Sequence, residues 1–276
     1  MDLPHNNGKT HWCLDDIAFD KVDRRLIADD EFMFVTLAAA SFTEILAELY
    51  SENLIEHFRG NAAVTEWLST SWRHEEVQHG KALKKYVQTV WPEFDWERGY
   101  QAFEIDYGLL CTAEQLEQNR SMELIARCVV ETGTASFYRA LQHYAREPVL
   151  CQLLENIKND EIAHYTHFRR YFNGYDSVSR QSFRAICATM WRRLHAIESE
   201  DAYVALKHVH LVRYPDRPFL VSDYRKYSRT TKRLARTHYP FEMAVKMLIK
   251  PIPLADSIKK ILHWPLVGMA RLVSFT

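Results

Sequence analysis

The sequence predicts an all-α protein, and two observations support this prediction. The 276-residue chain contains only eight glycines and nine prolines, which is few for a turn-rich β-protein and leaves room for long, uninterrupted helices. In several stretches the apolar residues recur at steps of three and four, the spacing that places them on one face of a helix. The expected architecture is therefore a helical bundle around one large core.

Four long helices can be placed in the first two thirds of the chain from this periodicity. Their expected boundaries are about 30–58, 62–90, 116–146 and 148–172. Gly60, Pro92 and Pro148 mark the breaks between them, because glycine and proline interrupt helices. The connection between the second and third helices is polar, aromatic and too long for a tight hairpin. Four long helices with one long crossover describe a ferritin-like four-helix bundle.

The remaining residues, about 176–276, are expected to add further helices to the bundle. Helical segments are predicted at about 179–197 and 199–210, followed by a basic tail that prolines interrupt. No stretch has the composition of a linker, so a single domain is expected over 1–276, with its core bundle at about 30–172.

Charge and cysteine content argue against several other classes of protein. The 35 basic and 36 acidic residues nearly cancel, which gives no reason to expect a nucleic acid partner. The five cysteines are scattered without a C-x-x-C pair, so a reducing, cytoplasmic setting is expected. The N-terminus lacks the apolar core of a secretory signal. No run of about 18 apolar residues is present that would form a transmembrane segment.

Two Glu-x-x-His motifs lie on the second and fourth predicted helices. They consist of Glu76 with His79 and of Glu161 with His164. Residues three apart project to the same side of a helix, so each pair can reach one point inside the bundle. Chance alone predicts about one such spacing in a chain of this composition. The placement of the motifs is therefore more informative than their presence.

The other two predicted helices each offer a glutamate at a matching distance. A carboxylate-bridged di-iron site takes one glutamate from each of two helices and a Glu-x-x-His motif from each of the other two. Glu131 precedes Glu161 by 30 residues and Glu44 precedes Glu76 by 32, while Glu48 is a rival to Glu44. The expected ligands of two iron ions are Glu44, Glu76, His79, Glu131, Glu161 and His164.

Neighbouring residues are expected to orient these ligands. A ligating imidazole usually donates its second N–H to a carboxylate, and Asp160 and Glu75 each precede a ligand glutamate. The pseudo-symmetry of the two motifs pairs Asp160 with His79 and Glu75 with His164. The hydroxyl of Thr134 either points toward the metal pocket or bonds its own helix backbone, and spacing alone does not separate these interpretations.

Four short strings resemble, in order and content, motifs of the soluble acyl-acyl-carrier-protein desaturases, particularly the shorter bacterial members. The strings are TEILAELY, EEVQHG, ETGT and DEIAH, and they contribute Thr43, Glu44 and Tyr50, then Glu75 to Gly80, then Glu131 and Thr134, then Asp160 to His164. The resemblance covers about 30–172 and favours Glu44 over Glu48. It also implies that Thr134 lies beside the oxygen-binding side of the irons.

The resemblance implies an enzyme, an O₂-dependent di-iron oxidoreductase that desaturates an acyl chain carried on acyl carrier protein. A ferredoxin-like donor would supply electrons, Thr134 would deliver protons, Asp160 would support the site, and a homodimer is expected. The alternatives are a related hydroxylase, N-oxygenase or aldehyde-deformylating oxygenase acting on a small molecule, and an iron-binding or storage bundle. Ile157 stands where one N-oxygenase pattern has an additional histidine, which counts against that reaction.

The C-terminal third is rich in positive charge. The segment 213–250 holds ten basic residues and three acidic ones. Acyl carrier protein is acidic, so this segment is either a surface that steers its approach or an ordinary solvated surface. The last 30 residues mix apolar and basic side chains, a pattern that suits contact with a membrane surface, contact with a partner subunit, or folding back over the bundle.

Overall fold

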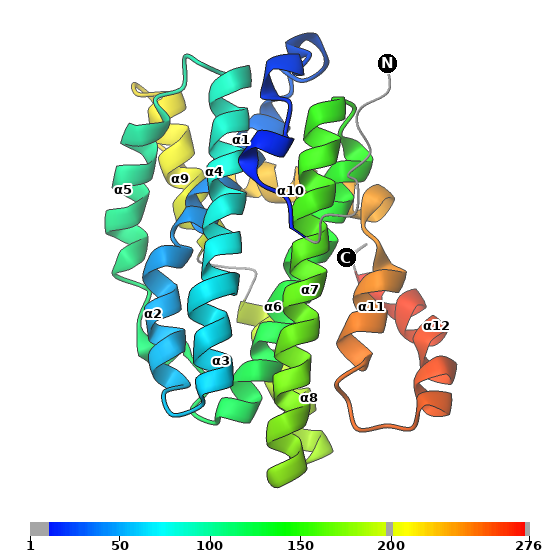
Figure 1. Ribbon diagram of the computed structural model, residues 1–276. Coiled ribbons are helices and arrows are strands. Elements are labelled where there is room, and N and C mark those ends of the chain that lie inside the picture. The colour runs from blue at the N-terminus through cyan, green and yellow to red at the C-terminus, as the bar shows by residue number, and fades with distance from the viewer. Residues whose placement is uncertain (1–10, 197–200, 274–276) are drawn as a thin grey trace.

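The computed structural model describes residues 11–196 and 201–273. Within these residues the protein consists of twelve α-helices, several short helical turns and connecting loops, without a strand, which confirms the all-α prediction (Figure 1). The four predicted rods are formed by α1 (Glu31–Ile45) with α2 (Ala47–His57), α3 (Ala62–Trp67) with α4 (Arg73–Val90), α6 (Arg120–Tyr144) and α7 (Pro148–Val178).

Side-chain caps explain where several of these helices begin. The carboxylate of Asp30 accepts a hydrogen bond from Met33 N at 2.9 Å, and the side chain of Asn119 accepts from Ser121 N at 2.9 Å. Glu147, fully buried before Pro148, accepts from Leu150 N at 2.7 Å. Each bond satisfies a backbone N–H that has no partner within its own helix.

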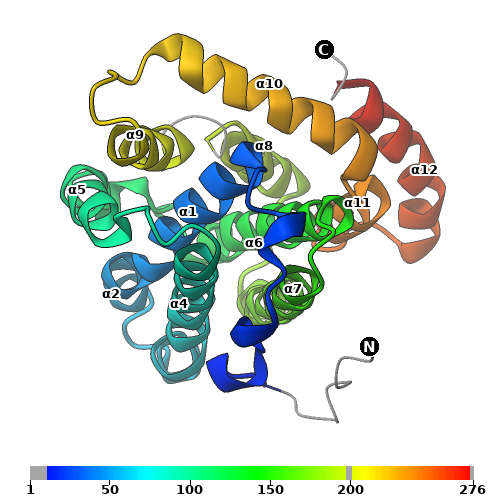
Figure 2. The same ribbon diagram turned by 90° about the horizontal axis from the view of Figure 1, so that it is seen from above.

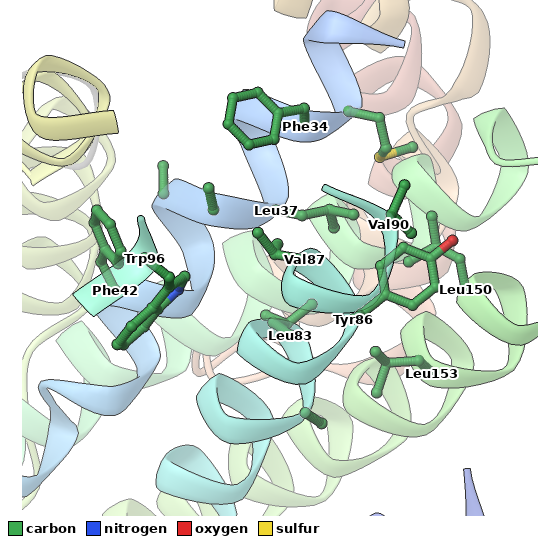
Figure 3. Close-up of a cluster of buried hydrophobic side chains, with 14 of the residues drawn as sticks. Phe34, Leu37, Phe42, Leu83, Tyr86, Val87, Val90, Trp96, Leu150 and Leu153 are labelled. Atoms are coloured by element: carbon green, nitrogen blue, oxygen red, sulfur yellow. The ribbon is translucent and has the colours of Figure 1, made fainter. Parts of the chain in front are cut away.

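The four rods pack in two pairs around a common interior. α1 lies beside α4 and α6 lies beside α7, while α4 also contacts α7, as the view from above shows (Figure 2). One apolar cluster lies between the upper halves of the rods, where Tyr86 of α4 lies beside Leu150 and Leu153 of α7 and Val87 of α4 lies beside Leu37 of α1 (Figure 3). A second cluster, which includes Trp72, packs the lower halves. The buried layer between the two clusters contains the predicted metal ligands.

The first rod differs from its prediction because it is bent. α1 and α2 meet at an angle of 42° around Leu46, although the sequence contains neither glycine nor proline at this position. The cause is tertiary: a Cβ on Gly80 would lie 2.5 Å from the backbone nitrogen of Ile45, so α4 approaches the end of α1 as closely as a glycine permits. The bend leaves Glu44 directed into the bundle at the tightest helix contact.

The second rod contains a π-helical turn, η4 (Leu68–Trp72), between α3 and α4. A π-helical turn inserts an extra residue and often accompanies a functional site. Here it immediately precedes the first Glu-x-x-His motif, and it holds Trp72 in the buried interior. Helical periodicity alone predicted one straight helix over this range.

Two further features of the bundle differ from the prediction. The crossover was predicted to be a long polar and aromatic connection, with no helix assigned to it, but it contains a helix, α5 (Trp96–Gly108). The fourth rod was predicted to end near 172, but α7 continues to Val178. The reason is tertiary support: the hydroxyl of Tyr175 accepts a hydrogen bond from the Asn61 amide at 3.1 Å, and its ring contacts Phe58.

The C-terminal extension is helical, as expected. Its helices are α8 (Phe183–Ala196), α9 (Asp201–Arg213), α10 (Val221–His238), α11 (Phe241–Ile249) and α12 (Asp256–Val273). The first two match the predicted segments closely, and the last three lie in the basic tail, where no helix boundaries were predicted. α9 packs on α1 and α5, both α8 and α11 pack on α6, and α12 packs on α11. The extension therefore covers one side of the bundle.

The length and hydropathy of the helices bear on membrane insertion. No single helix in the described ranges is long and apolar enough to cross a membrane. Only the bent pair of α1 and α2 passes such a test, and buried core helices commonly do so.

Candidate metal centre

Six ionisable side chains meet in the layer between the two apolar clusters. They come from the end of α1 (Glu44), from α4 (Glu76 and His79), from α6 (Glu131) and from α7 (Glu161 and His164). All six are buried, with at most 7% of any residue exposed. Because an isolated buried charge costs several kcal/mol or more, such a gathering of acids requires positive charge or protons among them.

The six side chains form two overlapping sets of four, each of which could hold a metal ion. One set is Glu44, Glu76, His79 and Glu161, and the other is Glu76, Glu131, Glu161 and His164. Within each set the ligand atoms lie within 4.8 Å of one another. Glu76 and Glu161, one from each Glu-x-x-His motif, belong to both sets. These two carboxylates are therefore placed to bridge a pair of ions.

The imidazoles turn one nitrogen toward this shared point. Nδ1 of His79 lies 3.3 Å from Oε1 of Glu161, and Nδ1 of His164 lies 3.1 Å from Oε1 of Glu76. Both Nδ1 atoms, and Oε1 of Glu161, are buried without a hydrogen-bond partner. Buried polar atoms rarely stay unpaired. A metal cation that accepts their lone pairs would satisfy all three, so the residues present fit a metal site.

The opposite nitrogen of each imidazole contacts a carboxylate from the other motif. Nε2 of His79 lies 3.0 Å from Oδ2 of Asp160, and Nε2 of His164 lies 2.7 Å from Oε2 of Glu75. These are the two pairs that the pseudo-symmetry of the motifs predicts. If each Nε2 carries the proton, as such a carboxylate favours, each Nδ1 is left free to bind a metal.

Charge crowding shifts the pKa values of the buried acids in different directions. Burial, assisted by repulsion from Glu161 and Glu76, raises the pKa values of Glu44 and Glu131 well above that of an ordinary glutamate. Burial acts on Glu161 in the same sense, but attraction from His79, whose Nδ1 lies 3.3 Å from Oε1, and from His164 lowers its pKa to about 2. The centre thus combines one carboxyl group of lowered pKa, that of Glu161, with two carboxyl groups of raised pKa, those of Glu44 and Glu131.

The two histidines respond to the surrounding acids. Burial opposes the charging of His79 and His164, yet the carboxylates around them raise the pKa of both imidazoles well above the ordinary value. Protons and metal ions therefore compete for the same atoms, because a metal ligand has to be a carboxylate or a neutral imidazole.

We expect metal binding to release protons and to weaken as the pH falls. Carboxyls and imidazoles with raised pKa values keep their protons to a higher pH than free side chains do, so metal affinity should still be rising with pH between about 6 and 8. Calorimetric titration with Co²⁺ in two buffers of different ionisation enthalpy measures both effects. An affinity that does not change with pH, without proton release, would contradict this expectation.

Thr134 faces the centre from α6. Its hydroxyl lies 2.8 Å from Oε2 of Glu161, and it also lies 3.2 Å from the carbonyl of Val130 and 3.3 Å from that of Glu131. The Thr134 hydroxyl therefore contacts both the metal centre and its own helix backbone, the two positions that its sequence left open. The hydroxyl proton can be donated to the helix backbone or to a shared carboxylate, and rotation about one bond exchanges the two.

Three aromatic side chains that the ligand pattern did not select hold the carboxylates in place. The hydroxyl of Tyr138 donates a short hydrogen bond to Glu44, and Nε1 of Trp72 donates to Oε1 of Glu131 at 3.3 Å. The hydroxyl of Tyr50 lies 3.4 Å from Glu76. A signal for Tyr138 existed, since a residue seven positions after Glu131 lies on the same face of the helix.

Trp12 is a member of the site that no local pattern indicated. Its indole Nε1 donates to Oδ2 of Asp160 at 2.6 Å, and its ring lies parallel to that of His79 with centroids 6.1 Å apart. A hydrogen-bonded path thus runs from Trp12 through Asp160 to His79. The outer end of this path opens on a surface pocket lined by His11, Trp12, Thr70, Ser71, His74, Glu75, Gln78 and Asp160.

The structure brings all six predicted ligands together. It separates the two rivals on the first rod, because Glu44 is buried in the centre whereas Glu48 is exposed to solvent. No protein-family model matches the chain, and no curated protein is significantly similar to it in sequence. The fold and the site define an all-helical protein whose buried glutamates and histidines could bind metal.

Proposed function

We propose that the chain is a ferritin-like di-iron oxidoreductase. The observation that carries the proposal is the pair of overlapping four-residue sets sharing Glu76 and Glu161. Four anionic carboxylates with one imidazole for each ion suit two iron ions, and the arrangement takes one glutamate from each of two rods and a Glu-x-x-His motif from each of the others. The pairwise packing of the four rods supports the same assignment.

A resident metal pair is favoured over iron storage. Each predicted ligand glutamate has a hydrogen-bond donor or an imidazole beside it, such as Tyr138 for Glu44 and Trp72 for Glu131. Donors in fixed positions preorganise the ligands for one metal arrangement. A storage site has to pass many ions through, which does not require this degree of fixation.

The bound irons, once reduced, would activate O₂ for oxidation of an unactivated carbon centre. The protein's own groups have separate tasks. Thr134 holds a proton at Oγ1, within reach of Glu161, and can deliver it to the centre. The apolar clusters above and below the ligands exclude bulk water from the reaction.

Among substrates, an acyl chain on acyl carrier protein is our first choice, and a free small molecule is the alternative. The motif resemblance supports the acyl chain. The surface pocket beside Trp12 and Asp160 and a second one around Glu52 and Arg59 are lined mainly by polar side chains, so cavity shape does not contribute to this choice. Reduced, iron-loaded protein incubated with acyl-carrier thioesters should yield a product lacking two hydrogens. A product with an added oxygen would indicate hydroxylation, and the absence of substrate-dependent O₂ uptake would refute an oxidoreductase.

The surface of α10 supports an acidic protein partner. This helix exposes six basic side chains, and its only acidic residue is Asp223. The six are Arg225, Lys226, Arg229, Lys232, Arg233 and Arg236. A concentration of one charge on a single helix attracts an oppositely charged protein at long range.

Reversing charge on α10 is expected to weaken recognition of a carrier-bound substrate without altering the chemistry. The double variant Arg229→Glu with Arg233→Glu should raise KM for acyl carrier protein thioesters about tenfold or more, with kcat nearly unchanged. The matched control is Lys81→Glu with Arg180→Glu, which changes the same charge at exposed positions elsewhere. Equal effects of the two variants would refute α10 as the docking surface.

Replacing Thr134 with valine should uncouple O₂ consumption from product formation. Valine preserves the shape of threonine but removes the hydroxyl that reaches Glu161, so iron content should stay unchanged while product formed per O₂ consumed falls about ten- to a hundredfold. The control is Thr132→Val, because the Thr132 hydroxyl bonds only the carbonyl of Cys128 at 2.7 Å. A Thr134 variant with normal coupling would exclude the proton-delivery role.

A further inference from the structure

The last described helix, α12, lies at the outer edge of the molecule. Both views show it beside α11, on the opposite side of the protein from α5 (Figures 1 and 2). Val267 is its one fully buried side chain, and it packs with Phe241 and Val245 of α11 in a small apolar cluster. The helix is thus attached to the protein along a narrow inner strip.

The opposite face of α12 is apolar and exposed, which reverses the usual orientation of a surface helix. Its members recur at steps of three and four and therefore form one continuous stripe. They are Ile258 (44% exposed), Ile261 (72%), Leu262 (38%), Met269 (57%) and Leu272 (68%), with Pro265 also exposed. A contiguous apolar stripe facing away from the core marks an interaction surface.

A tryptophan flanks this stripe, and basic residues lie beyond it on the same helix. On the helical wheel Lys260 and Arg271 lie on one side of it, with Trp264 (63% exposed) between them and the stripe. Arg271 also lies 3.9 Å from the carboxylate of Glu242. From 241 to 273 there are five basic residues and two acidic ones, a net charge of +3 in a chain whose total is −1. Tryptophan and basic side chains beside an apolar face are typical of a helix that lies in a membrane interface.

We propose that α12 docks the protein on the surface of an anionic lipid bilayer. The helix lies parallel to the membrane, its apolar stripe enters the headgroup boundary, and the net positive charge of 241–273 attracts it to anionic lipids. A second copy of this chain fits the surface less well. Two copies packed through α12 would bring together two segments (241–273) that each carry a net charge of +3, and Asp256 is the only acid on each helix to offset it. The inference does not depend on the metal centre.

Flotation of the full-length protein with lipid vesicles tests this proposal. The protein should float with vesicles of phosphatidylcholine and phosphatidylglycerol, and at least about tenfold less with phosphatidylcholine alone. The double variant Ile261→Asp with Leu272→Asp should lose binding at least about tenfold, because it places two charges in the inserted stripe. The matched control, Ile105→Asp with Leu109→Asp, alters two residues of equal exposure near the end of α5 and should bind like the wild type.

A second readout follows the helix itself. Binding should shift tryptophan emission to shorter wavelength, and the Trp264→Phe variant should lose most of that shift while still floating. The proposal is overturned if the wild type does not float with anionic vesicles, or if both double variants bind equally. It is also overturned if the wild type is a dimer that Ile261→Asp with Leu272→Asp converts to a monomer, since the stripe would then be a subunit interface.

Discussion

Replacing Glu161 with alanine is expected to remove both metal ions at once. Glu161 belongs to both four-residue sets and its pKa is lowered to about 2, so it contributes one negative charge that both ions would share. Glu44 belongs to one set only. After anaerobic loading with Fe²⁺, the metal content should fall from about two ions per chain to nearly none in Glu161→Ala, and to about one in Glu44→Ala.

The first rod provides a matched control for this series. Glu48 lies one turn after Glu44 but is exposed to solvent, so Glu48→Ala should retain the full metal content. Metal analysis by mass spectrometry, together with circular dichroism to verify the helical fold, distinguishes ligand loss from unfolding. Retention of both ions by Glu161→Ala would remove the basis of the proposed centre, and loss of metal from Glu48→Ala would show that the ligand assignment on this rod is wrong.

A single methyl group at Gly80 is expected to disrupt both the fold and the site. An added Cβ would lie 2.5 Å from the backbone nitrogen of Ile45 and from its Cγ1, and a backbone atom cannot move aside as a flexible side chain can. Gly80 follows His79 and Ile45 follows Glu44, so separating the helices here also separates two ligands. We expect Gly80→Ala to lower the free energy of unfolding by about 3 kcal/mol and to reduce metal occupancy in parallel.

Gly174 offers the corresponding control on another helix. It lies inside α7, and nothing would lie within 4 Å of a Cβ placed there. Gly174→Ala should therefore stabilise the protein by up to about 1 kcal/mol, through helix propensity alone. Thermal denaturation of the two variants, with metal content measured on each, tests the claim. If Gly80→Ala has the stability and metal content of the wild type, the close approach of α1 and α4 does not align the ligands.

The helix α5 in the crossover was not predicted, because a glycine interrupts the apolar periodicity of its sequence. Trp96, Gly99, Phe103 and Tyr107 are the buried residues of α5, and they share one helical face. Glycine at the second position hides this periodicity, because glycine normally signals a break. Its role becomes visible only in the tertiary structure, where a Cβ on Gly99 would lie 2.8 Å from the ring of Phe42. The glycine allows a close helix contact and does not end the helix.

The ligands of the metal centre could be predicted because side-chain directions within a helix follow from sequence spacing. Within a helix the direction of each side chain follows from its position, so the spacing of Glu76 with His79 and of Glu161 with His164 already placed each pair on one face. The equal intervals to Glu44 and Glu131 then indicated a shared target. These inferences needed no knowledge of how the helices pack.

Contacts between distant segments were decided by packing alone. The bend at Leu46 and the hydrogen bond of Trp12 to Asp160 across 148 positions have no local signal. The sequence of α12 indicated an apolar face but left open whether that face points inward or outward. The physical reason is that helix periodicity specifies which residues share a face but not which surface that face meets. That choice depends on close packing and on the pairing of buried charges across the whole molecule.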